Sequence, residues 1–182
     1  MGDRVIGGHI SVKARSVENE EAVAWIDEGD KVKSVVPRSL MRSRNLLHRA
    51  VYVLVWDASG RIFVHQRSFQ KDLYPGFWDL CITGVPQLGE SYEEAARREL
   101  QEEIGLADAR TTELFSIRYQ DAYTNVLGRV YSCRTSASPV IQDSEIVAGF
   151  FVDLGRLTEL LATQKFCPDG LEVWRRFTRV YD

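Results

Sequence analysis

The hydrophobic residues of this chain change their spacing several times, and each change predicts an element. Residues 49–56 (RAVYVLVW) and 61–67 (RIFVHQR) are rich in β-branched and aromatic side chains, and the turn at 57–60 between them predicts a β-hairpin. Residues 91–104 contain no Gly or Pro, and their apolar residues recur every four positions, which predicts an amphipathic helix. Further strands are expected at 22–27, 32–36, 77–83, 112–123, 126–134 and 145–152, and further helices at 38–44, 154–163 and 169–179. Strands on both sides of a central helix, with more helices at the end, indicate an α/β fold with a mixed sheet between helices.

The length of the chain suits one domain with a terminal extension. A chain of 182 residues is long enough to bury a sizeable core. Residues 1–21 are polar and irregular, and we expect an N-terminal extension there, either disordered or partly a leader sequence. Residues 22–182 are expected to form a single domain.

Composition and charge exclude several classes of protein. With 45% hydrophobic and 27% charged residues, the chain is typical of a soluble globular protein. Its net charge of −3 predicts no general binding of nucleic acid or anionic membranes. No apolar run approaches a membrane span, and the N-terminus lacks the hydrophobic segment of a signal peptide. We therefore expect no membrane partner and a cytoplasmic location.

The cysteines indicate neither a disulfide framework nor a zinc site. Cys81, Cys133 and Cys167 are odd in number and show no CxxC spacing. Buried, reduced thiols are the expected state in a cytoplasmic protein.

The helix at 91–104 carries the candidate chemistry of the chain. Glu99, Glu102 and Glu103 follow the i, i+3, i+4 pattern and so share one sector beside the apolar stripe. Three carboxylates on one face repel each other unless cations lie among them, and Mg²⁺ or Mn²⁺ prefers such oxygen ligands. Arg98, four residues before Glu102, can hold that carboxylate in place. The alternative for such a pattern is a solvated, glutamate-rich face.

The ends of the same helix are marked in the sequence. Ser91 followed by Glu94 predicts a capping box at the start. Gly105 supplies the C-terminal stop.

Residues 84–106 (GVPQLGESYEEAARRELQEEIGL) resemble the Nudix box, GX5EX7REUXEEXGU with U aliphatic, and every specified position matches. The matching residues are Gly84, Glu90, Arg98, Glu99, Leu100, Glu102, Glu103, Gly105 and Leu106. The resemblance implies the Nudix fold, a mixed β-sheet in an α/β/α sandwich. It also implies a metal-dependent pyrophosphohydrolase that cleaves a diphosphate linkage in a nucleoside diphosphate derivative.

The resemblance further implies roles for individual residues. Glu99, Glu102 and Glu103 would bind Mg²⁺ or Mn²⁺, with the main-chain carbonyl of Thr83 completing the site and Arg98 among the catalytic residues. Glu145 falls where Nudix enzymes often carry a further acidic ligand or base. The general base stays open among Glu102, Glu103 and Glu145. Glu90 resembles the position that braces the box loop.

Outside the box, the run HRAVYVLVW…GRIFVHQRSFQKDLYPGFWD…GVPQLGE is similar to the Nudix branch related to isopentenyl diphosphate isomerase. Arg67 and Lys71 match the isomerase positions that hold a diphosphate, and a guanidinium and an ammonium suit phosphate oxygens. Thr83 replaces the catalytic Cys of the isomerase, and Val85 replaces a metal-binding His. His48 is the one member of that histidine set present, so we interpret it as structural. Isomerase-like activity is kept as an alternative to hydrolysis.

The substrate is left open among nucleoside di- and triphosphates, ADP-ribose-like sugars and dinucleotides. Tyr123 falls where dinucleoside polyphosphate hydrolases tend to carry a Tyr, although strands favour Tyr in any case. A module that senses a nucleotide or RNA without turnover is the alternative from another class. The resemblance also allows a homodimer.

Overall fold

The computed structural model describes residues 20–181. The elements along the chain are β1 (Ala22–Ile26), β2 (Val32–Pro37), α1 (Arg38–Ser43), β3 (His48–Asp57), β4 (Ile62–Arg67), β5 (Trp78–Asp79), β6 (Ile82–Gly84), α2 (Tyr92–Ile104), β7 (Thr111–Gln120), β8 (Asn125–Thr135), β9 (Ile146–Val152), α3 (Leu154–Thr163) and α4 (Pro168–Tyr181). The expected N-terminal extension lies outside the described residues except for its last two. Of these, Glu20 accepts a hydrogen bond from the backbone N–H of Ser39, and Glu21 pairs with Arg38 at the start of α1.

The long strand β3 is the axis of the nine-stranded mixed sheet. One edge of β3 runs parallel to β8 without a shift in register, from the pair His48–Val126 to the pair Asp57–Thr135. Its other edge is shared in turn by β1, β6 and β4. The middle of that edge, residues 51–53, pairs with β6, which delivers the chain to the loop before α2.

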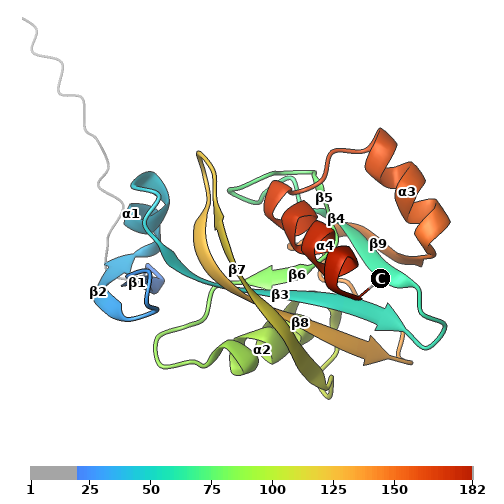
Figure 1. The fold of residues 1–182 in the computed structure, drawn as a ribbon, viewed down its shortest axis with the longest axis horizontal. Helices are drawn as coiled ribbons and strands as arrows, with labels where there is room; N and C mark the ends of the chain where they lie inside the picture. Colours follow the sequence, from blue (N-terminus) through green and yellow to red (C-terminus); the bar gives the residue numbers. More distant parts are fainter. Residues whose placement is uncertain (1–19, 182) are drawn as a thin grey trace, which may run out of the picture.

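Successive residues of β3 contribute to two different cores. Ala50, Tyr52 and Leu54 pack in the core that also contains residues of α3 and α4. The intervening valines at 51, 53 and 55 pack with the apolar stripe of α2. Figure 1 shows α2 on one side of β3 and α4 on the other. Burial on both faces explains why this strand reads as a continuous apolar run, and the expected α/β/α sandwich is confirmed.

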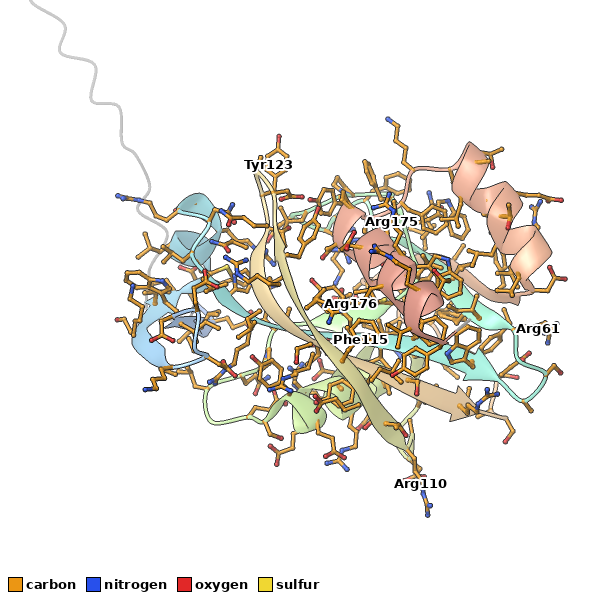
Figure 2. The ribbon with its side chains drawn as sticks, viewed as in Figure 1. Arg61, Arg110, Phe115, Tyr123, Arg175 and Arg176 are labelled. Atoms are coloured by element: carbon orange, nitrogen blue, oxygen red, sulfur yellow. The ribbon has the colours of Figure 1, made fainter. Side chains whose placement is uncertain are left out.

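Aromatic residues attach α4 to the sheet. Trp56 at the end of β3 packs against Trp174 and Phe177 of α4, with ring centroids 6.1 and 5.6 Å apart. The guanidinium carbon of Arg176 lies 5.0 Å from the ring centroid of Phe115 in β7, a contact that can be followed in Figure 2. These contacts hold the second half of α4 against the sheet, and Asp169 in its first turn lines the candidate site described below.

The expected strand at 77–83 is wrong as a single element. Trp78–Asp79 forms β5, which pairs with β4, whereas Ile82–Gly84 forms β6, which pairs with β3. The side chain of Asp79 accepts hydrogen bonds from the backbone N–H groups of Leu80 and Cys81, at 2.8 and 3.2 Å. A side chain that takes over these donors competes with the strand ladder and lets the chain cross from one partner to another.

The expected hairpin of 49–56 and 61–67 is confirmed at its turn but not along its strands. Asp57 N–H donates to the carbonyl of Arg61 at 2.9 Å, yet Trp56–Ile62 is the one pair that β3 and β4 share. Beyond it, β4 pairs with β9 and β5. The two strands separate because β6 occupies the neighbouring part of the β3 edge.

We predict that Leu100→Ala destabilises the fold strongly. The Leu100 side chain is fully buried between α2 and β3, so truncation leaves a cavity that costs about 2–5 kcal/mol of unfolding free energy. Chemical denaturation of the purified protein measures this loss. Leu154→Ala, at an exposed leucine of α3, is the matched control and should change stability by less than about 1 kcal/mol. Similar losses for both variants would contradict the central packing role of α2.

Candidate functional site

Helix α2 presents its three glutamates at the border between core and solvent. The Ser91–Glu94 capping box is present, and Gly105 ends the helix in the left-handed conformation, as predicted. The apolar stripe of Ala96, Leu100 and Ile104 is fully buried, which fixes the rotation of the helix. As a result the side chain of Glu103 is 6% exposed, that of Glu99 13% and that of Glu102 55%.

The guanidinium of Arg98 joins these carboxylates to the loop before the helix. Its Nη1 donates to Glu99 Oε1 at 2.7 Å and to Glu102 Oε2 at 3.0 Å, so the expected contact with Glu102 is confirmed. Its Nε and Nη2 form a bidentate pair with Glu90 at 2.9 and 3.0 Å. Nη2 also donates to the carbonyl of Val85 at 3.2 Å. One side chain thereby orients two glutamates and fastens the loop to the helix.

The loop itself is shaped for close approach. Glu90 Oε2 accepts a hydrogen bond from the backbone N–H of Gln87 at 2.7 Å, which closes the loop on itself. At Gly84, a Cβ atom would lie 2.0 Å from Glu99 Oε1, so any larger residue would displace the carboxylate. Glycine at this position lets Glu99 lie directly against the backbone that follows Thr83.

Lys71 lies against two of the carboxylates. Its ammonium pairs with Glu145, just before β9, and lies 3.7 Å from Glu103 Oε1. Burial raises the pKa of Glu103 to about 7, although the positive charge of Lys71 acts in the opposite direction. Burial also raises the pKa of Glu99, against the effect of Arg98. Arg67, the other predicted phosphate ligand, donates through Nε and Nη2 to the carbonyl of Leu73, at 3.4 and 3.2 Å.

Two cavities meet at this point. The first, of about 500 Å³, is here called the glutamate cavity; it is lined by Arg98 and by all the predicted metal ligands, namely Thr83, Glu99, Glu102, Glu103 and Glu145. The second, of about 130 Å³, is called the arginine cavity because Arg38, Arg42 and Arg67 line it. Lys71 and the Thr83–Val85 backbone line both cavities. The structure therefore brings the predicted site residues together around two adjoining cavities, with the glutamates in one, Arg67 in the other and Lys71 lining both.

The residues of the glutamate cavity fit a hard divalent cation by their chemistry. All the predicted ligands offer oxygen atoms, as Mg²⁺ and Mn²⁺ prefer. Because Gly84 has no side chain, the carboxylate of Glu99 can lie next to the backbone there. Within residues 20–181, however, no three His, Cys, Asp or Glu side chains already converge as a ligand set. Arg98 holds Glu99 and Glu102, while Lys71 holds Glu103 and Glu145. A cation would therefore bind in exchange for these internal ion pairs.

The sequence indicated His48 only as a structural residue and did not indicate the other polar groups of the arginine cavity. Its lining includes Asp79, Asp169, Tyr52, Thr124 and His48, which come from β5, α4, β3 and the β7–β8 turn. The signal for Asp169 in the sequence was its place in the first turn of a helix, where a negative charge interacts favourably with the helix dipole. Alternation along β3 could have indicated Tyr52, because it is the polar tip among the apolar residues of one face.

Tyr123 does not reach either cavity. It lies in the turn between β7 and β8, beyond the strand end at Gln120, and is 64% exposed. Figure 2 shows it at the outer tip of that hairpin. Its place in the sequence therefore gives no information about the substrate.

Comparison with known proteins shows the family of the chain. The model of the NUDIX domain matches residues 46–175, which include α2, the loop before it, β3 and most of α4. The chain belongs to the Nudix family. Membership of this family makes it a Nudix pyrophosphohydrolase.

Curated relatives match over most of their own length. An uncharacterised Nudix hydrolase of Pseudomonas aeruginosa is 32% identical, and the match covers 90% of this chain and 96% of that protein. Another from Streptomyces coelicolor is 35% identical, with 86% of this chain and 88% of that protein covered. Among solved structures, a protein of Deinococcus radiodurans has a TM-score of 0.74 at 27% identity, covering 86% of this chain and 98% of that one.

A more distant structure shares the fold alone. The NUDIX domain of NrtR from Shewanella oneidensis has a TM-score of 0.61 at 14% identity, over 79% of this chain and 98% of that one.

Across the described residues, the helices are too short or too polar to cross a membrane. All three cysteines are buried free thiols.

We predict that Asp79→Asn becomes more stabilising, relative to wild type, as the pH rises. Burial, followed by the negative charge of Asp169, raises the pKa of Asp79 from 3.8 to about 7, while Arg67 and the Cys167 thiol act in the opposite direction. Between these values the folded state binds more protons at this carboxyl than the unfolded state, so its contribution to stability falls as the pH rises. Asparagine keeps the acceptor for Leu80 and Cys81 without the charge.

Thermal unfolding of both proteins between pH 4 and pH 8.5 measures this effect. The difference in Tm should grow between about pH 4 and pH 7 and level off above pH 7. A difference that does not change with pH would mean that Asp79 titrates normally in the folded protein.

Proposed function

We propose that this protein is a metal-dependent hydrolase that cleaves the diphosphate linkage of a nucleoside diphosphate derivative. The observation that carries the proposal is the pair of adjoining cavities. The glutamates of α2 and Glu145 line one, Arg67 lines the other, and Lys71 and residues 83–85 line both. Anionic ligands for a cation and cationic ligands for phosphate are the two parts that such a reaction needs.

The carboxylates of the glutamate cavity would hold Mg²⁺ or Mn²⁺. Glu99 and Glu103 are the buried members, Glu102 and Glu145 are more exposed, and the carbonyl of Thr83 adds a neutral oxygen. When bound, the cation would neutralise phosphate oxygens and make water a better nucleophile. Divalent ions are general in the Nudix family, which supports this assignment.

The protein itself would orient the reactants. Arg98 keeps Glu99 and Glu102 in fixed directions, and its bidentate pair with Glu90 holds the loop that carries Gly84. The general base is one of Glu102, Glu103 and Glu145, because each lines the cavity in which water would attack. Arg67 and Lys71 would bind the diphosphate, and Lys71 becomes available for it when a cation replaces its ammonium beside Glu103.

The structure favours hydrolysis over isomerisation. Thr83 and Val85 stand where the isomerase resemblance requires a Cys and a His. The nearest thiol, Cys81, is fully buried in the core, and burial raises its pKa well above the ordinary value. An inert thiol cannot supply the acid–base chemistry of an isomerase.

Glu103→Gln should lower kcat by at least about 100-fold. The change keeps the shape of the side chain but removes one charge from the cation site, a loss typical of a strong electrostatic contributor. Phosphate release from a panel of nucleoside di- and triphosphates, ADP-ribose and dinucleotides, with Mg²⁺ and with Mn²⁺, provides the best substrate and the rates.

Glu93→Gln is the matched control for this experiment. Glu93 is an exposed glutamate of the same helix that pairs with Arg97 at 3.4 Å, and its variant should keep the wild-type rate. Near-full activity of Glu103→Gln would remove Glu103 from the site. Binding of nucleotides without turnover of any substrate by the wild type would instead indicate a sensing module.

Arg67→Ala should raise KM more than it lowers kcat. The guanidinium would contact the diphosphate in the ground state as well as in the transition state, so its loss costs about 1.5–3 kcal/mol, or roughly 10–100-fold in kcat/KM. Steady-state kinetics on the best substrate of the panel separate the two constants. Arg61→Ala, just before the other end of β4, is the control and should behave as wild type. Unchanged kinetics of Arg67→Ala would place the diphosphate elsewhere.

A further inference from the structure

The arginine cavity contains polar groups that the proposed reaction does not use. Thr124, in the β7–β8 turn, is 3% exposed, and its Oγ1 has no hydrogen-bond partner among the described residues. The hydroxyl of Tyr74 lies close to Thr124 and donates to Asp121 at 2.7 Å. Arg42 Nε is buried and has no partner in the described part of the chain either. Because buried polar atoms nearly always form hydrogen bonds, both atoms point to a ligand of this cavity.

His48 adds a buried acceptor to the same wall. Its side chain is almost completely buried, and Nδ1 lies 2.8 Å from the carbonyl of Leu46. A carbonyl oxygen only accepts, so Nδ1 carries the proton and Nε2 presents its lone pair. Burial lowers the pKa of His48 to about 4, which keeps the ring neutral at physiological pH. The interpretation of His48 as purely structural therefore leaves out its position on the cavity.

Two carboxyl groups, those of Asp169 and of the buried Asp79, also line the cavity. Asp169 Oδ2 accepts a hydrogen bond from the hydroxyl of Tyr52 at 3.0 Å, which uses one of about four acceptor positions of a carboxylate. Asp79 reaches the same region, since a Cβ atom on Gly170 would lie 2.3 Å from Asp79 Oδ1. A glycine after Asp169 thus permits the two carboxyls to approach. Buried acceptors of this kind are stabilised by hydrogen-bond donors.

We propose that the arginine cavity is a specificity pocket for a compact polar group, with hydroxyl or amino donors, that is attached to the diphosphate of the substrate. This inference rests on the proposed function, because Arg67 and Lys71 hold the diphosphate at the mouth of the pocket. Donors of the group bind Asp169 and His48 Nε2, a hydroxyl exchanges a hydrogen bond with Thr124 Oγ1, and an acceptor binds Arg42 Nε. The volume of about 130 Å³ matches one ring-sized group, since a cavity of roughly 150 Å³ holds benzene.

The pocket also explains what the protein rejects. An apolar branch, such as an isopentenyl group, would offer no hydrogen bond to Thr124, Arg42, His48 or the remaining acceptor positions of Asp169. A pocket built to bind hydroxyl or amino groups discriminates strongly against an analogue that lacks them. Selectivity for polar over apolar diphosphate derivatives distinguishes this pocket from a site that binds the diphosphate alone.

The test compares two non-hydrolysable probes in the full-length protein with Mg²⁺. Both are monoesters of methylenebisphosphonate; one carries a butyl group and the other a 3,4-dihydroxybutyl group. Calorimetric titration should show that the wild type binds the dihydroxybutyl ester at least about 10-fold more tightly. Thr124→Val, an isosteric change, should reduce this preference about 3–10-fold, and Asp169→Asn should reduce it at least as much.

Thr111→Val is the matched control. Thr111 on β7 also has a buried Oγ1 without a partner among residues 20–181, but it lines neither of the two cavities. Its variant should keep the full preference. If Asp169→Asn does not fold, Thr124→Val and Thr111→Val still decide the question.

Each outcome bears on a different proposal. Equal binding of the two esters by the wild type, a preference for the butyl ester, or no binding of either would overturn the specificity pocket. A loss of preference in Thr111→Val equal to that in Thr124→Val would overturn it as well. If the wild type prefers the dihydroxybutyl ester but hydrolyses no diphosphate of the substrate panel, the hydrolase proposal fails and the pocket stands.

Discussion

Compensation of negative charge around α2 is the constraint on which the rest of the site depends. Glu90, Glu99, Glu102, Glu103 and Glu145 lie within one region, and three of them are nearly buried. Arg98 satisfies three of these carboxylates and Lys71 the other two. Since an unpaired buried charge costs several kcal/mol, neither cation can leave unless another positive charge takes its place. Burial of these carboxylates lowers the stability of the folded protein, and the same carboxylates prepare the site for a divalent ion.

The strand β3 connects this charge cluster to the second cavity. Its odd-numbered valines support α2 and therefore the glutamates, while Tyr52 on the other face reaches Asp169 of α4. The two functional parts lie on opposite faces of one strand, and they meet where the Thr83–Val85 backbone runs along its edge. A rigid central strand thus sets the distance between cation ligands and substrate pocket.

The parts of the site that local sequence determines were predictable. Helical periodicity and the capping box place Glu99, Glu102 and Glu103 on one sector of α2, because 3.6 residues per turn leaves little choice. The contact of Lys71 with Glu145 was not predictable, since the two residues come from the loop after β4 and the segment before β9. The meeting of Asp79 with Asp169 required the break between β5 and β6 and the docking of α4. Neither leaves a signature in the spacing of residues.

The parallel pairing of β3 with β8 has a consequence for how the protein folds. Each pair, from His48–Val126 onward, joins residues 78 positions apart, with α2 and β7 between them. The β7–β8 hairpin and α2 are local and can form early, whereas closing so long a loop costs entropy before any contact repays it. We expect the β3–β8 pairing to limit the folding rate. Helix α2 would then form first, and its glutamates would stay solvated until the β3–β8 pairing completes the sheet on which the helix packs.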